Sequence, residues 1–95
     1  HLAEPFRLED VAEHMNMSPS AFSRYFKKVM GKTFSRFVNE LRIGQACRAL
    51  LESDQPIASI AYQAGFNNLS NFNRRFRELR GVSPRQFREN ATVNE

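Results

Sequence analysis

Two arginines occupy matching places in a pattern that occurs twice in this chain. Phe22-x-Arg24-x-Phe26 recurs 50 residues later with Arg74 at its centre. On a helix each arginine lies about 200° from the phenylalanine two residues before it, so one faces outward when the other is buried. The two parallel donors of an exposed arginine match guanine O6 and N7, and they also suit a phosphate group. The pattern therefore indicates two exposed sites able to bind a base or a phosphate.

The segment around Arg24, residues 18–31, has the periodicity and end signals of an amphipathic helix. Its apolar residues recur at a 3.6-residue period and are expected to form one buried face: Phe22, Tyr25, Phe26, Val29 and Met30. Ser18 and Pro19 are a start signal and Gly31 is a stop signal. Another amphipathic helix, residues 8–15, precedes this one closely. The pair predicts either a helix-turn-helix or an ordinary helical hairpin of a small bundle.

The helix pair recurs in the second half of the chain, which favours two copies of one helix-turn-helix. Residues 8–15 match residues 57–64 at a shift of 49 rather than 50. The difference of one residue places an insertion in the second turn, where Gly65 stands in place of Asn16. Both residue types tolerate the left-handed backbone of a tight turn. A solenoid is not expected, because two copies are too few for a repeat array.

A long helix is expected to connect the two copies, over about residues 33–53. Its apolar residues are expected to form a single stripe: Phe34, Phe37, Val38, Leu41, Ala46, Cys47, Leu50 and Leu51. Gly44 costs about 1 kcal/mol in a helix interior relative to alanine, which predicts a close packing contact there. About 19 helical residues span roughly 28 Å, close to one turn of B-DNA. Such a helix would hold both units in successive major grooves.

The domain organisation follows from these elements. Residues 1–53 are expected to form the first unit with the connecting helix, and residues 54–95 the second unit. The second unit is expected to hold three helices and a frayed end: residues 56–64, 69–80, 84 to about 89, and 90–95.

Charge is distributed unevenly along the chain. Of the 14 lysines and arginines, seven lie in residues 18–48 and six in residues 70–88, whereas only Glu40 and Glu78 of the 10 acidic residues lie there. Basic charge around both candidate helices is the electrostatic pattern of a nucleic-acid binder.

Other functional classes are disfavoured by what the sequence lacks. A single cysteine, Cys47, excludes an internal disulfide, and its apolar neighbours predict a buried thiol. His14 is a lone histidine on the polar side of its expected helix, so a surface residue is expected rather than a metal ligand. No apolar run reaches membrane-spanning length and no signal peptide is evident. We expect a cytoplasmic, nucleoid-associated protein with no metal, no cofactor and no enzymatic activity.

The motifs resemble the signature of the AraC/XylS family of bacterial transcription regulators. The second half carries Pro56-Ile57-x-x-Ile60-Ala61-x-x-x-Gly65-Phe66 and Phe72-x-Arg74-x-Phe76-(x)4-Gly81-x-Ser83-Pro84-x-x-Phe87-Arg88. The first half adds Leu8-x-x-Val11-Ala12, Ser18-x-x-x-Phe22-x-Arg24-x-Phe26-Lys27, Gly31 and Arg42-x-x-x-Ala46-x-x-Leu50-Leu51. The resemblance implies an all-α, homeodomain-like fold of the AraC type, with seven helices forming two helix-turn-helix subdomains joined by a long central helix. Only the end of the first helix, His1 to about Ala3, is expected here.

The resemblance also implies a function and a set of site residues. The function is sequence-specific binding of double-stranded DNA, with RNA polymerase as a further partner and dimerisation through an absent N-terminal domain. The implied base-reading residues are Ser20, Ser23, Arg24, Ser70, Asn71 and Arg74. The phosphate-contacting residues are expected to be Lys27, Lys28, Lys32, Arg36, Arg75, Arg77 and Arg85. Arg75 is expected at the core edge, with its stem packed and its charge outward.

Three rival functions remain open at the level of sequence. An RNA-binding module would expose its aromatic residues for stacking, whereas the phenylalanines here follow the buried positions. A DNA-repair alkyl transferase would need an activated Cys47, and no histidine lies near it in the sequence. A protein-interaction module is the third alternative.

Overall fold

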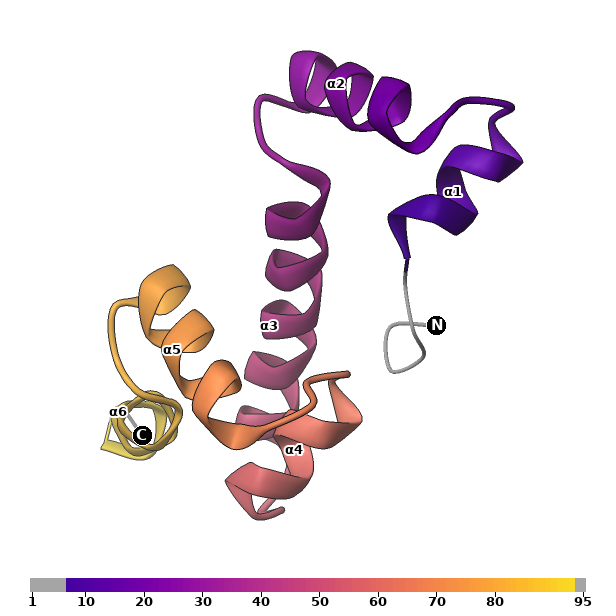
Figure 1. The fold of residues 1–95 in the computed structure, drawn as a ribbon. Helices are drawn as coiled ribbons and strands as arrows, with labels where there is room; N and C mark the ends of the chain where they lie inside the picture. Colours follow the sequence, from indigo (N-terminus) through magenta and orange to yellow (C-terminus); the bar gives the residue numbers. More distant parts are fainter. Residues whose placement is uncertain (1–6, 94–95) are drawn as a thin grey trace.

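The computed structural model of the protein describes residues 7–93, and the regular secondary structure of this part of the chain is all helical (Figure 1). The helices are α1 Leu8–His14, α2 Pro19–Met30, α3 Phe34–Glu52, α4 Ile57–Gln63, α5 Leu69–Arg80 and α6 Pro84–Val93. Two helix-turn-helix units, α1–α2 and α4–α5, lie at opposite ends of α3, in a molecule of 48 × 23 × 21 Å. The predicted all-α fold with a long central helix is confirmed. The resemblance implies one more helix before α1, expected to end at about residue 3, and this helix falls outside the described residues.

The two turns have the same backbone construction. Asn16 and Gly65 both adopt positive φ, at 57° and 101°. Immediately after them, the Met17 amide donates to the carbonyl of Ala12 at 2.9 Å, and the Phe66 amide donates to that of Ala61 at 3.1 Å. The donors of the two hydrogen bonds are 49 residues apart in the sequence, and so are their acceptors. The internal repeat predicted from the sequence is therefore a repeat of structure.

Each unit has its own cluster of phenylalanine rings. In the first unit Phe26 packs edge-on against Phe37, with ring centroids 5.3 Å apart. In the second unit Phe76 and Phe87, the residues 50 positions later, pack in the same way at 5.5 Å. Edge-to-face packing at this separation stabilises an aromatic pair beyond the area it buries. The phenylalanines therefore form the core of each unit, as their spacing predicts.

Helix α3 has two buried faces, so the predicted single stripe is wrong. Phe34 and Val38 at its N-terminal end join the core of the first unit. Ile43 joins the core of the second unit, with Ala46, Cys47 and Leu50 on the same side. Phe34 and Ile43 are nine residues apart, which at about 100° per residue places them half a turn apart. Leu41 and Leu51, expected in the stripe, are exposed. The two units therefore pack on roughly opposite sides of one helix.

The predicted apolar face of α2 is only partly buried. Phe22 is buried and Phe26 is half-buried, as expected. Val29 is 61% exposed, and Tyr25 and Met30 are also exposed. Among residues 7–93, the buried residues of the first-unit core are Ala12, Phe22, Phe34 and Val38. Of the predicted apolar face of α2, Phe22 is the residue that enters this buried core, and Phe26 packs at its edge.

The last helix is longer than the sequence predicts. Helix α6 extends to Val93, although residues from 90 onward were expected to fray. It packs against α3 and α5, and its Arg88 reaches the C-terminal end of α3. There Arg88 Nε donates to the carbonyl of Leu50 and an Nη donates to that of Ser53, both at 3.1 Å. These bonds satisfy carbonyls that the helix end leaves without intrahelical partners.

Gly44 does not make the close packing contact predicted for it. Apart from its chain neighbours and the backbone of its own helix, a Cβ atom built at this position would meet no heavy atom within 4 Å. The residue is half-buried on α3, between the faces used by the two units. Its conformational penalty is therefore not offset by a close approach of another element.

Replacing Gly44 by alanine should stabilise the chain by about 1 kcal/mol, because alanine has the higher helix propensity and the space is open. Denaturant unfolding of the Gly44→Ala variant measures the effect as a higher midpoint at an unchanged slope. A lower midpoint would show that this position is crowded in solution.

Removing the Arg88 guanidinium should destabilise the second unit by about 2–4 kcal/mol, because two charge-assisted hydrogen bonds to partly buried carbonyls are lost. Arg88→Met keeps most of the aliphatic stem. Arg85→Met is the matched control, since Arg85 pairs with Glu89 at the surface of the same helix and its loss should change stability by less than about 0.5 kcal/mol. Equal effects of the two changes in thermal unfolding would refute a capping role for Arg88.

Candidate nucleic-acid interface

The second helix of each unit has the same kind of N-terminal and C-terminal cap. Ser18 Oγ accepts a hydrogen bond from the Ala21 amide at 3.2 Å at the start of α2. Asn68 Oδ1 accepts one from the Asn71 amide at 2.7 Å at the start of α5. Both helices end at a glycine in the left-handed conformation. Equivalent caps hold the two helices at equivalent lengths of 12 residues, so their exposed faces correspond position by position.

The candidate base-reading residues lie on these outer faces. In α2 they are all exposed: Ser20, Ser23 and Arg24. In α5, Ser70 and Arg74 are exposed and Asn71 is half-buried. The opposite face of each helix carries the buried phenylalanines, so both sets of polar residues point away from their cores. The structure thus presents two separate polar surfaces, one on each unit.

The two surfaces differ in how their arginines are held. In α5 an Nη of Arg74 donates to Asn71 Oδ1 at 3.1 Å, which links two of the candidate readers. The equivalent residue to Asn71 in α2 is Ala21, which offers no such acceptor. The amide oxygen of Asn71 is also the atom that would accept from adenine N6. Because an amide oxygen has two lone pairs, Asn71 can accept from Arg74 and keep one acceptor position for a base.

A polar cleft of about 920 Å³ lies between the two units, beside the N-terminal half of α3. We call it the central cleft. Its lining residues come from the end of α2, the start of α3 and the C-terminal half of α5: Lys27, Gly31, Lys32, Thr33, Ser35, Arg36, Asn39, Glu40, Arg75, Glu78 and Leu79. Four of the seven candidate phosphate-contacting residues are among them. The cleft therefore shows that the C-terminal halves of α2 and α5 border one common space.

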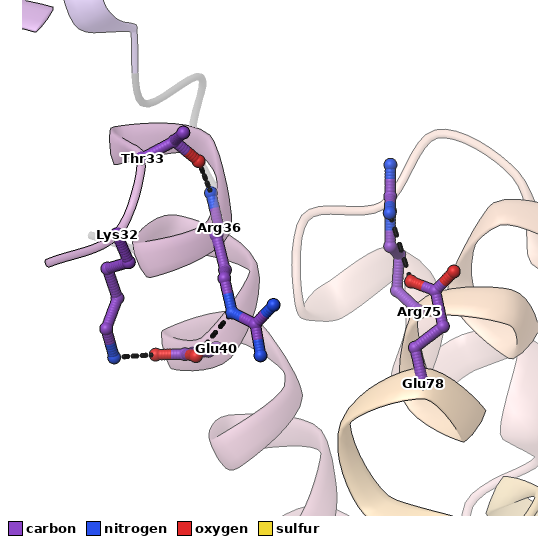
Figure 2. A network of polar contacts seen from close by, with 6 residues as sticks. All are labelled: Lys32, Thr33, Arg36, Glu40, Arg75 and Glu78. Carbon is purple, nitrogen blue, oxygen red and sulfur yellow. Dashed lines mark hydrogen bonds and ion pairs between the residues drawn. The ribbon is translucent and has the colours of Figure 1, made fainter. Parts of the chain in front are cut away.

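Inside the central cleft, Glu40 binds two of these basic residues (Figure 2). Lys32 Nζ donates to its Oε1 at 2.7 Å, and Arg36 Nε donates to its Oε2 at 3.2 Å. These hydrogen bonds, first from Lys32 and then from Arg36, hold the pKa of the Glu40 carboxyl below its usual value. Glu40 is therefore ionised at neutral pH and uses both oxygens to neutralise neighbouring charge.

Of the remaining candidate phosphate-contacting residues, Lys27 lines the cleft, two arginines form ion pairs and two basic residues are exposed outside the cleft. Arg75 pairs with Glu78 at 3.0 Å on the α5 wall of the cleft, and it is half-buried, as its position at the core edge predicts. Arg85 pairs with Glu89 at 3.2 Å on α6. Exposed positions outside the cleft are occupied by Lys28 and Arg77.

Sequence reasoning did not assign a role to Glu40 or Glu78. Both line the central cleft, and both pair with candidate phosphate-contacting residues. The available signal was their isolation, since they are the two acidic residues within the two basic segments.

Cys47 is buried in the second-unit core, as predicted, and burial raises the pKa of its thiol. A thiol with a raised pKa is a poor nucleophile at neutral pH. Among residues 7–93 there is no group of three metal-binding side chains. Within the same residues, no helix combines the length and apolar character needed to cross a membrane.

The arrangement of two helix-turn-helix units with matching polar helices defines a DNA-binding domain of the kind found in transcription regulators. Comparison with known sequences agrees with this class, because residues 11–90 match a family model described as a helix-turn-helix domain. The chain belongs to the AraC/XylS family of transcription regulators.

Individual relatives support the same family. The chain is 43% identical over 94 residues to the regulatory protein PocR of Salmonella typhimurium, covering 99% of this chain and 31% of PocR. It is 41% identical over 90 residues to the transcriptional activator RhrA of Rhizobium meliloti, covering 93% of this chain and 28% of RhrA. The chain therefore spans under a third of the length of these two curated relatives.

A solved structure extends the comparison to the fold. The DNA-binding domain of AdpA, a global transcriptional factor solved in complex with a target DNA, superposes with a TM-score of 0.92 at 29% identity. The match covers 100% of this chain and 86% of that one.

The carboxyl of Glu40 should titrate below the ordinary range of about 4.3, because Lys32 and Arg36 stabilise its charged form. A carboxyl with a lowered pKa contributes stability above its unfolded pKa and loses that contribution as the pH falls through its folded pKa. Carbon-detected NMR titration measures this pKa directly. Lys32→Met should move it back toward the ordinary value, and an unchanged pKa in that variant would show that Lys32 does not bind Glu40 in solution.

Proposed function

We propose that this domain binds duplex DNA with α2 and α5 in successive major grooves, so that one chain reads one asymmetric site. The observation that carries this proposal is the structural repeat, which presents two capped helices with outward polar faces at either end of α3. An α-helix fits the major groove, where each base pair shows a distinct pattern of donors and acceptors. The AdpA domain, similar over the whole chain, was solved with a target DNA.

We assign base reading to the outer faces of the two helices. The residues are Ser20, Ser23 and Arg24 in α2, and Ser70, Asn71 and Arg74 in α5. Arginine discriminates guanine with two parallel donors, whereas serine is short and discriminates weakly. Arg24 therefore supplies most of the specificity of the first unit. Its alternative role, a phosphate contact, predicts a different response to mutation.

Phosphate contacts are assigned to the basic residues around these helices. They are Lys27, Lys28, Lys32, Arg36, Arg75, Arg77 and Arg85. Residues 1–53 and 54–95 act as the two DNA-binding units, with α3 counted in the first and packed against both. Contacts with phosphate fix the register of the protein on the duplex without carrying sequence information.

The wider biological role rests on the relatives. We propose a cytoplasmic, nucleoid-associated domain without enzymatic activity, joined in its parent protein to a domain that dimerises. RhrA is named as a transcriptional activator, which supports activation as the role of this chain, and RNA polymerase is the further partner that we propose for it. RNA binding is the second candidate, and it is disfavoured because the rings of Phe22, Phe66, Phe72 and Phe76 are buried.

Binding to duplex DNA should weaken steeply with salt, because basic residues that contact phosphates release bound cations. Neutralisation of about six to eight phosphates predicts a slope of log K against log salt of roughly −5 to −7. Fluorescence anisotropy with duplex DNA, duplex RNA and a buffer control measures this slope and the preference for DNA. A slope near zero, or tighter binding to duplex RNA, would exclude the proposed function.

Arg24→Ala and Arg74→Ala should each weaken binding by about 1–3 kcal/mol and relax sequence preference in opposite halves of the site. The reason is their equivalent position on the two helices. Selection from a random duplex library, performed with each variant, measures the preference. Arg77→Ala serves as the comparison, since loss of a phosphate contact weakens all sequences alike. If the Arg24 and Arg74 variants behaved like Arg77→Ala, both arginines would be phosphate contacts.

A further inference from the structure

The central cleft contains two acidic residues among the basic residues that the proposed function assigns to DNA phosphates. Four basic residues line the cleft, together with Glu40 and Glu78: Lys27, Lys32, Arg36 and Arg75. The two carboxylates lie beside these basic residues, which the proposed function assigns to phosphate contacts. Each carboxylate lowers the attraction of the cleft for a polyanion.

Of the two acidic residues, Glu40 is the more firmly engaged. Both its oxygens accept hydrogen bonds, whereas Glu78 uses one oxygen for Arg75. The side chains of Glu40 and Lys32 are 30% and 35% exposed, against 53% for Glu78. An ion pair that is partly withdrawn from water is screened less by salt than an exposed one. The Lys32–Glu40 pair is therefore the stronger restraint on a basic group of the cleft.

The two partners of Glu40 are engaged differently. Lys32 offers its single ammonium to Glu40 at 2.7 Å. Arg36 uses only Nε, and Figure 2 shows its two terminal nitrogens directed away from Glu40, toward the α5 side of the cleft. Arg36 can therefore donate to a phosphate while it still holds Glu40. Lys32 has to weaken or break its contact with Glu40 to do the same.

We propose that Glu40 is an internal competitor of DNA phosphate for Lys32, which lowers the affinity of this domain for duplex DNA of any sequence. The inference rests on the proposed function. In the free chain the carboxylate occupies the ammonium of Lys32. When a phosphate takes Lys32, Arg36 remains to neutralise Glu40, so no unpaired carboxylate is left facing the DNA. Glu40 thus sets how strongly the basic surface holds any sequence, while the base-reading residues set which sequence is preferred.

The test compares Glu40→Gln with wild-type chain on a mixed-sequence duplex of about three helical turns, over about 50 to 200 mM salt. Glutamine keeps the size of the side chain and removes its charge. We expect Glu40→Gln to bind about threefold to fivefold more tightly, with a similar salt slope, because Lys32 contacts phosphate in both complexes. Thermal unfolding of both chains confirms that the variant is folded.

Two controls separate competition from a simple gain in net charge. Glu52→Gln makes the same charge change at the exposed C-terminal end of α3 and should leave affinity within about twofold at these salt concentrations. Lys32→Met removes the group for which Glu40 is proposed to compete, so adding Glu40→Gln to it should give a clearly smaller gain than in the wild-type chain. An equal gain from Glu52→Gln, or an undiminished gain in the Lys32→Met background, would overturn the proposal.

Two other outcomes have distinct meanings. Weaker binding by Glu40→Gln would overturn the proposal and show that Glu40 positions Lys32 and Arg36 for the phosphate. Failure of the wild-type chain to bind duplex DNA at low salt would instead remove the proposed function itself, and the competition with it.

Discussion

The structure depends on one helix having two buried faces. Phe34 and Val38 complete the first-unit core, and Ile43 and Leu50 complete the second, on roughly the opposite side of α3. Each helix-turn-helix needs residues of α3 to complete its core. The face of α3 on which a unit packs therefore fixes the position of that unit. A small domain cannot bury enough apolar surface in two independent halves, and a shared helix resolves that shortage.

The same constraint arranges the charged surface. The units pack at opposite ends of α3 (Figure 1), and residues from the C-terminal halves of α2 and α5 both line the central cleft. The cleft collects basic residues from three helices and also the two carboxylates of the basic segments. In our proposal, sequence-specific contacts come from the outer faces of the helices, whereas four of the seven assigned phosphate contacts lie in the space between the units. The choice of sequence and the affinity for DNA in general are thereby assigned to different residues.

Features set by local chemistry could be predicted from the sequence. The caps at Ser18 and Gly31 and the shift of 49 in the turn depend on a few neighbouring residues, and they were predicted correctly. The two faces of α3 and the exposure of Val29 depend on where other elements pack, which apolar periodicity does not reveal. The Lys32–Glu40 pair was missed for the same reason, because it joins a residue before α3 to one within it. The assignment of individual residues to bases and phosphates stays a prediction.

The central claim is that α3 makes two helix-turn-helix units act together on one face of a duplex. Hydroxyl-radical footprinting of this chain on a sequence selected from a random duplex library tests the claim most directly. We expect two protected segments on the same face, about one helical turn apart, within an asymmetric site occupied by a single chain. Protection confined to one groove segment, or a requirement for a palindromic site, would contradict the account.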